Sequence, residues 1–269
     1  MKLWAISDLH VGYEENRRVV QELPEYPDDW LIVAGDTGET PGHLDFVLRT
    51  LRPRFAQVVW TPGNHDLWTP RTSPAEKRGV AHYERLVALC RTYGVLTPED
   101  PYARWPGDGP TRAIVPTFLL FDYSFRPASV TREQAVAWAA ESGVRSNDED
   151  LLAPNPYATR DDWCAARVAA TETRLASLPA DARLIIVNHF PLRRELAVPP
   201  RIPRFSLWCG TTRTEDWHRR FNIEAVVSGH LHLRSSRVLD DVRYEEVSLG
   251  YPKQWNQSKT LADYLRRIL

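Results

Sequence analysis

The sequence has 269 residues, enough for one sizeable hydrophobic core, and its 43% hydrophobic and 26% charged residues are ordinary for a globular protein. A net charge of −1 and the lack of any run of like charge argue against a nucleic-acid-binding protein. No apolar segment approaches the roughly 20 residues that span a bilayer, and the N-terminus "MKLWAISDLH" is not typical of a signal peptide, so no membrane partner is expected.

Short apolar runs bounded by turn residues alternate along the chain with segments of helical periodicity. The apolar runs predict buried strands at residues 3–7, 30–35, 57–60, 113–121, 184–188 and 224–229. Apolar residues at three- and four-residue spacing predict helices at residues 14–23, 42–51, 81–93 and 161–178. Residues 236–250 predict a hairpin that turns at Asp240 and Asp241. This order predicts an α/β protein with a mixed central sheet.

Two stretches do not fit the alternation of strands and helices. Residues 123–160 are polar and rich in Pro and Asn, and residues 191–214 are rich in Pro, Arg and aromatic residues. Long loops inside a compact domain are more often functional than idle. Because no linker or repeat is visible, we expect a single domain over residues 1–269 in which these two segments form a substrate cap.

Polar side chains that bind metals follow directly after five of the predicted strands. Five of the eight histidines lie in such positions, together with two aspartates and an asparagine. In α/β sheets, ligand sites are built at the carboxyl ends of the strands. The residues concerned are Asp8, His10, Asp36, Asn64, His65, His189, His230 and His232.

Singly, each of these residues has a structural explanation as a turn former or a hydrogen-bonded side chain. Burying all of them together without partners would cost several kcal/mol each, and bound cations remove that cost. The three distant cysteines Cys90, Cys164 and Cys209 argue against a disulfide framework or a thiolate site and favour a reducing, cytoplasmic location. Oxygen and imidazole donors suit Mn or Fe, and also Zn. Seven donors are too many for one ion, so two ions that share a carboxylate are expected.

The ordered motifs "DLH", "GD", "GNHD", "NH" and "GHLH", between residues 8 and 232, resemble the calcineurin-like metallophosphoesterase superfamily. The resemblance implies an αββα sandwich of mixed β-sheets flanked by helices. It further implies one ion bound by Asp8, His10, Asp36 and His232, and a second bound by Asp36, Asn64, His189 and His230, with Asp36 as the bridge. It assigns His65 to the substrate rather than to a metal.

The resemblance implies a metal-dependent phosphoric ester hydrolase in which a metal-bridging hydroxide attacks phosphorus. Asp36, Asn64 and His65 are the expected catalytic residues, and His65 would protonate the departing oxygen. Asp66 follows His65 directly, so its side chain is expected to point elsewhere and to brace the loop.

Segments outside the metal motifs, such as "FSLWCGTTRTEDWH" (205–218) and "EEVSLGYPKQW" (245–255), resemble an actinobacterial branch that includes phosphopantetheinyl hydrolases. This resemblance implies a phosphodiesterase that removes 4'-phosphopantetheine from the serine of a holo acyl or peptidyl carrier protein. The candidate substrate-binding residues are Arg193, Arg213, Trp208 and Tyr123. The arginines would attract an acidic carrier protein, and the tryptophan would frame a channel for the arm, but a solvated loop face and core packing remain alternatives.

Two other functions remain open from the sequence. A phosphomonoesterase that acts on a small phosphorylated metabolite would use the same metal site. A non-catalytic scaffold would be indicated by the loss of a metal ligand, and every ligand position is filled.

Overall fold

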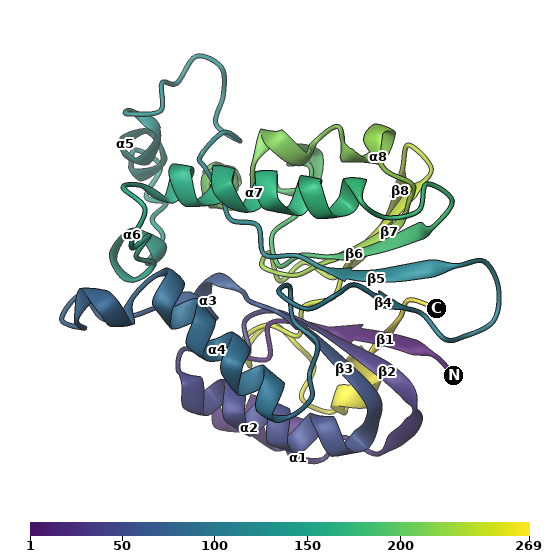
Figure 1. Cartoon of the computed structure of the whole chain (residues 1–269). Coiled ribbons are helices and arrows are strands. Elements are labelled where there is room, and N and C mark those ends of the chain that lie inside the picture. The colour runs from purple at the N-terminus through teal and green to yellow at the C-terminus, as the bar shows by residue number, and fades with distance from the viewer.

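The computed structural model describes residues 1–269, and its two β-sheets lie face to face between layers of helices (Figure 1). The first sheet has the order β10-β1-β2-β3. Strands β1, β2 and β3 run parallel to one another, and the short β10 pairs antiparallel with β1. The bounds are β1 (Leu3–Ile6), β2 (Tyr26–Ala34), β3 (Phe55–Thr61) and β10 (Arg266–Arg267).

The second sheet has six strands in the order β4-β5-β6-β7-β9-β8. Four parallel strands form its centre, and an antiparallel strand closes each edge. The bounds are β4 (Ala103–Arg104), β5 (Arg112–Pro116), β6 (Arg183–Val187), β7 (Ile223–Ser228), β8 (Ser235–Leu239) and β9 (Val242–Glu246). β8 and β9 form the predicted hairpin, and Asp240 and Asp241 at its turn both have positive φ.

Helices cover the outer face of each sheet. α1 (Glu14–Gln21), α2 (Pro41–Leu51) and α4 (Val80–Thr92) lie on the first sheet, and α7 (Arg160–Ala176) lies across the second, with α8 (Trp217–Arg220) beside it (Figure 1). Each of the long helices buries one apolar stripe, as the periodicity predicted. The predicted fold class, mixed sheets flanked by helices in an αββα sandwich, is confirmed.

The central parallel strands, such as β1, β3 and β6, are largely apolar because both of their faces are buried. Thirteen buried residues, from the strands and from positions directly next to them, pack between the two sheets, among them Ala5 and Ile32 on one side and Ile185 and Val227 on the other. A larger cluster of 52 buried residues fills the space under the helices. Parallel sheets covered on both faces require this pattern.

The predicted strand at residues 113–121 is wrong in its second half, since β5 ends at Pro116. After this point the Thr117 hydroxyl donates to the carbonyl of Val187, and the backbone N–H of Leu119 donates to Asn188 Oδ1 at 3.0 Å. Side-chain bonds therefore replace the strand ladder, and the apolar residues that follow pack into the core as a loop.

The segment after β5 contributes α5 (Ala135–Ala140) and α6 (Asp148–Leu151), which lie at the left of Figure 1, beyond the carboxyl ends of the parallel strands. The short α3 (Asn64–Leu67) lies below them and directly follows β3.

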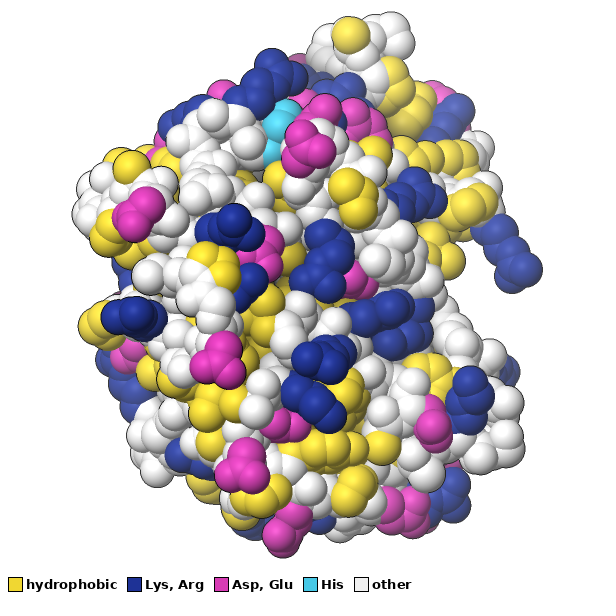
Figure 2. All heavy atoms as spheres, turned by 90° about the vertical axis from the view of Figure 1, so that its right-hand side faces the viewer, with side chains coloured by type: hydrophobic (Ala, Val, Ile, Leu, Met, Phe, Trp, Pro, Cys, Tyr) yellow, Lys and Arg dark blue, Asp and Glu magenta, His cyan; other side chains and the backbone are white.

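The face at the right of Figure 1, opposite α5 and α6, carries both chain termini. Lys and Arg side chains gather across the middle of this face, among acidic side chains (Figure 2). At the start of β5 and β6, Arg112 and Arg183 pair with Glu224. Arg243 and Arg266 pair in the same way with Glu245. The positive charge of this face is therefore offset by acidic partners.

Candidate metal centre

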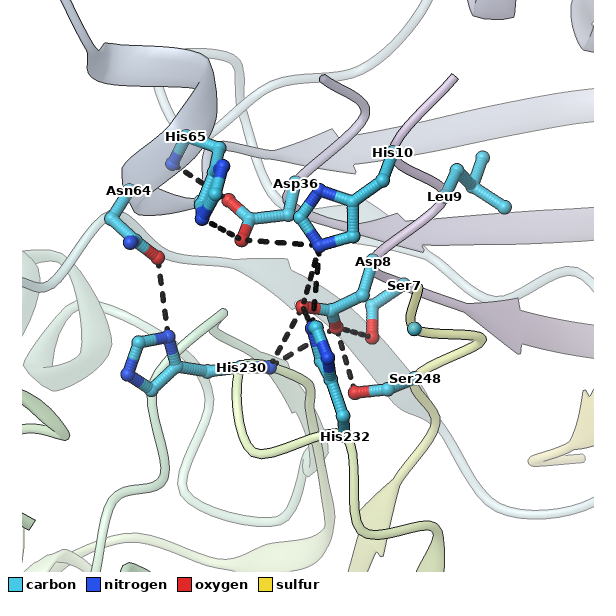
Figure 3. Close-up of polar contacts among 12 residues, drawn as sticks. Ser7, Asp8, Leu9, His10, Asp36, Asn64, His65, His230, His232 and Ser248 are labelled. Atoms are coloured by element: carbon cyan, nitrogen blue, oxygen red, sulfur yellow. Dashed lines mark hydrogen bonds and ion pairs between the residues drawn. The ribbon is translucent and has the colours of Figure 1, made fainter. Parts of the chain in front are cut away.

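The carboxyl ends of β1, β2, β3, β6 and β7 bring the predicted metal-binding side chains into one cluster (Figure 3). Asp8 and His10 follow β1, Asp36 follows β2, and the other members follow the remaining strands. Six of the seven predicted ligands are buried, and the seventh, His232, is half-buried. The seven are Asp8, His10, Asp36, Asn64, His189, His230 and His232.

The loops that carry these residues have an unusual backbone. Asp8, His10, Asp36, His230 and His232 all have positive φ, between 40° and 74°. L-amino acids disfavour this conformation, and its concentration at one place is typical of functional sites.

The glycines of the motifs make room for the cluster. A Cβ atom at Gly63 would collide with the Asp36 carboxylate, and one at Gly229 would collide with the Asp8 carboxylate. The glycines that precede Asn64 and His230 are therefore required by the close approach of the carboxylates to the backbone.

One half of the cluster consists of Asp8, His10 and His232. His232 Nε2 lies 3.0 Å from Asp8 Oδ1, and His10 Nε2 lies 3.3 Å from His232 Nε2. Asp36 Oδ2 lies 4.0 Å from His10 Nε2 and so closes this half of the cluster.

The orientation of this half is fixed from outside. The hydroxyls of Ser7 and Ser248 donate to Asp8 Oδ2 at 2.6 and 2.7 Å, so that Oδ1 faces His232 (Figure 3). Gln254 Oε1 lies 2.7 Å from His232 Nδ1, which leaves Nε2 of that ring facing the cluster. Such outer bonds set the tautomer of a metal-binding histidine.

The other half consists of Asp36, Asn64, His189 and His230. Asp36 Oδ2 lies 3.3 Å from His189 Nε2, and Asn64 Oδ1 lies 3.1 Å from both His189 Nε2 and His230 Nδ1. His189 Nδ1 lies 2.9 Å from the carbonyl of Ala34 and donates to it, so Nε2 is the ring nitrogen that faces the carboxylate and the amide. Asp36 is common to both halves.

The electrostatics of the cluster suit cations. Burial lowers the pKa of His10 and of His230 to about 3, so both imidazoles are neutral and keep a free lone pair. Burial alone would lower the pKa of His189, but the carboxylates of Asp36 and Asp8 outweigh this effect and raise it to about 10. The raised pKa indicates a strong negative charge around this imidazole. Three groups of carboxylate and imidazole atoms within 4.8 Å of one another could each hold an ion. The donor set therefore fits two cations that share Asp36.

His65 lies next to the cluster but is held differently. Its Nε2 is 4.0 Å from Asp36 Oδ2, and its Nδ1 is 3.5 Å from Glu39 Oε1 at the surface. Its ring stacks on Trp68 with centroids 3.6 Å apart. Although burial opposes it, the Asp36 carboxylate raises the pKa of His65 above its ordinary value. One of the candidate groups also contains His65, so distance alone permits it as a ligand.

Asp66 braces the loops, as the sequence predicted. Its Oδ2 accepts from the backbone N–H groups of Asp36 and Gly63 at 2.8 and 2.9 Å. Its Oδ1 accepts from the backbone N–H of Thr37 at 3.1 Å and from the Thr37 hydroxyl. One carboxylate thus joins the ends of β2 and β3, which carry Asp36 and Asn64.

Asp148 is a site residue that the sequence did not reveal. It lies in α6 with no exposed surface, and its Oδ1 accepts from Asn64 Nδ2 at 2.9 Å and from Trp68 Nε1 at 2.6 Å. The first bond turns Asn64 Oδ1 toward the histidines, and the second holds Trp68 against His65. No local signal distinguishes Asp148 from the other acids of "NDEDL".

A cavity of about 420 Å³ opens over the cluster. Asp36, Asn64, His65 and the two histidines of the last motif form its floor. Arg145, Asn147 and Trp68 stand on one side, and Ile202, Phe205 and Tyr251 are among the residues on the others. Both cap segments predicted from the sequence contribute to its walls.

None of the four substrate-binding residues expected from the sequence lines this cavity. Tyr123 and Trp208 are fully buried, and both donate to Glu149 Oε1, so their rings are part of the core. Arg193 pairs with Glu195 and Asp240, and Arg213 is exposed beside Asp122. Tyr123 and Trp208 had been expected to face a substrate. They are buried instead because their large rings fill the core and Glu149 accepts from their polar groups.

No helix of the protein combines the length and the apolar character that crossing a membrane requires.

The family model described as calcineurin-like phosphoesterase matches residues 1–234. The chain is 49% identical over 269 residues to the acyl-carrier-protein phosphodiesterase PptH of Mycobacterium tuberculosis, a match that covers 99% of this chain and 83% of the relative. The crystal structure of the phosphopantetheinyl hydrolase PptH from that organism is similar with a TM-score of 0.93 and 48% identity, and the match covers 100% of this chain and 95% of that one.

Proposed function

Because the chain belongs to the calcineurin-like phosphoesterase family and is a phosphoric ester hydrolase, we propose that it removes 4'-phosphopantetheine from the serine of a holo carrier protein. The observation that carries this proposal is the near-complete match to a relative named for that activity. The ends of the strands also bring together carboxylates and imidazoles that could hold metal ions. The family resemblance predicted from the motifs is confirmed.

We assign Asp8, His10, Asp36 and His232 to one divalent ion and Asp36, Asn64, His189 and His230 to the other. The neutral imidazoles of His10 and His230 and the ionised carboxylates support this division. Two ions bound there supply Lewis-acid stabilisation of the phosphoryl oxygens and a water of lowered pKa. The hard oxygen and imidazole donors favour Mn or Fe, with Zn as a further candidate.

His65 is placed to move a proton. The Asp36 carboxylate raises the pKa of its imidazole despite burial, and the stack on Trp68 fixes the ring at the floor of the cavity. From there its Nε2–H would donate to the serine oxygen that leaves phosphorus. Arg145, an exposed residue on the cavity wall, would contribute positive charge to the binding of the phosphodiester.

The proposal is tested by intact-protein mass spectrometry. A holo carrier protein is incubated with this enzyme and Mn²⁺, with the Asp36→Asn variant as the control. We expect the carrier protein to lose the whole phosphopantetheine group with wild-type enzyme only. An unchanged mass, together with chelator-sensitive hydrolysis of nitrophenyl phosphate, would keep the metal site and leave a phosphomonoesterase.

Replacement of His65 by alanine is expected to affect substrates according to their leaving group. A nitrophenolate leaves without protonation, whereas a serine alkoxide needs it, and general acid catalysis contributes about 10²–10⁴-fold. The rate with the holo carrier protein should therefore fall by about 10²-fold or more, and that with bis(4-nitrophenyl) phosphate much less. Metal analysis should still find both ions. Equal slowing of the two substrates would contradict the acid role.

The cytoplasmic location predicted from the cysteines remains part of this proposal. Cys90, Cys164 and Cys209 are free thiols and all are buried. Free thiols of this kind suit a reducing compartment.

A further inference from the structure

A second cavity, of about 380 Å³, lies beside the one over the metal cluster. Leu231, between the two histidines of the last motif, lines both cavities. The segment 198–202 also contributes to both cavities. Pro199 and Ile202 line the first cavity, and Val198 and Pro200 line the second. The two cavities are therefore adjacent, with Leu231 and the 198–202 segment between them.

Exposed apolar side chains line both cavities. Seven large hydrophobic residues of the chain are exposed, and four of them line these two cavities: Tyr13 (47%) and the aliphatic Val198 (47%), Ile202 (44%) and Leu233 (43%). An exposed apolar patch rimmed by polar residues is typical of a ligand-binding groove. The proposed metal site explains the first cavity but not why exposed apolar side chains line both cavities.

The second cavity itself is mixed in character. Leu196, Val198, Leu231 and Leu233 supply apolar surface. Polar groups line the cavity as well, among them the hydroxyls of Ser228 and Ser235, the guanidinium of Arg237 and the buried carboxyl of Glu246. A narrow ligand with alternating methylene, methyl, hydroxyl and amide groups matches such a lining better than a purely apolar or purely charged one.

We propose that the second cavity binds the pantetheine arm of the substrate while its phosphate occupies the first. This inference rests on the proposed function, which places a phosphodiester over the metal cluster. From there the arm passes over Leu231 and under the 198–200 segment. The gem-dimethyl and methylene groups of the arm contact the leucines and Val198, and its amides and hydroxyl face Ser228, Ser235 and Arg237.

The test narrows the second cavity with Val198→Trp and uses Val238→Trp as the matched control, since Val238 is exposed on β8 and does not line the cavity. The Michaelis constant is measured for a holo carrier protein and for bis(4-nitrophenyl) phosphate, which has no arm. We expect Val198→Trp to raise the ratio of the two constants about tenfold or more, an effect typical of one blocked apolar contact region. Val238→Trp should leave the ratio at its wild-type value. An unchanged ratio in Val198→Trp would overturn the proposal.

A binding measurement separates this inference from the proposed function. Pantetheine without phosphate is titrated calorimetrically into wild-type enzyme and both variants. Binding by wild type and Val238→Trp but not by Val198→Trp supports the arm site, even if the carrier protein proves not to be a substrate. Absence of binding to wild type, or equal binding to all three proteins, would refute it. If the carrier protein loses its arm but pantetheine does not bind, the proposed function survives and the arm site does not.

Discussion

Asp36→Asn is expected to abolish hydrolysis and to strip both metal positions. The Asp36 carboxylate is common to both halves of the cluster, at 3.3 Å from His189 Nε2 and 4.0 Å from His10 Nε2. An asparagine amide keeps the shape but removes the negative charge that the two proposed ions would share. Because changes even in the residues behind metal ligands cost about 10–100-fold, we expect turnover to fall by more than about 10³-fold.

Turnover and metal content of Asp36→Asn are measured together, the latter by plasma mass spectrometry after dialysis. Asp150→Asn is the control, since Asp150 is an exposed carboxylate that pairs with Arg71 on the surface. This control should retain full activity and two ions. If Asp36→Asn also keeps two ions and turns over, Asp36 does not bridge them.

The second large effect is expected for Asp148, through Asn64 and Trp68. Asp148→Leu removes the acceptor of two buried donors, and each unsatisfied group costs about 1–3 kcal/mol. Asn64 is then free to rotate away from His189 and His230. We expect activity to fall by about 10–100-fold, and the Mn²⁺ concentration needed for half-maximal activity to rise in proportion.

Asp148→Asn is the matched variant, because its amide oxygen can still accept from both Asn64 and Trp68. We expect it to stay close to wild type in activity and in Mn²⁺ requirement. A merely structural role would lower the melting temperature of both variants without changing the Mn²⁺ requirement. Loss of activity in Asp148→Asn equal to that in Asp148→Leu would show that the charge of Asp148 matters rather than its acceptor oxygen.

The metal cluster could be predicted from the sequence because its geometry follows from topology. Each member lies within a few residues of a buried strand, and parallel strands present their carboxyl ends at one edge. Apolar runs such as those containing Ile32 and Ile185 are easily recognised, so the positions of Asp36 and His189 followed. The role of Asp66 was also accessible, since it depends on neighbours in the same loop.

The surroundings of the cluster could not be predicted in the same way. Asp148 reaches Asn64 across 84 residues of chain, and no periodicity links them. Tyr123 and Trp208 were expected to bind the substrate, yet Glu149 satisfies both of their polar groups inside the core. Contacts between two irregular segments depend on how each folds over the sheets, and that information is not local.

The left-handed backbone of the cluster loops implies a compromise between stability and activity. Each of Asp8, His10, Asp36, His230 and His232 adopts a conformation that costs an L-residue roughly 1–2 kcal/mol. Selection for a robust fold alone would place glycine at such positions, where it would relieve the strain. Efforts to make this enzyme more heat-resistant should therefore leave these loops untouched and work on the helices and surface, because relaxing them would gain stability only by losing the catalyst.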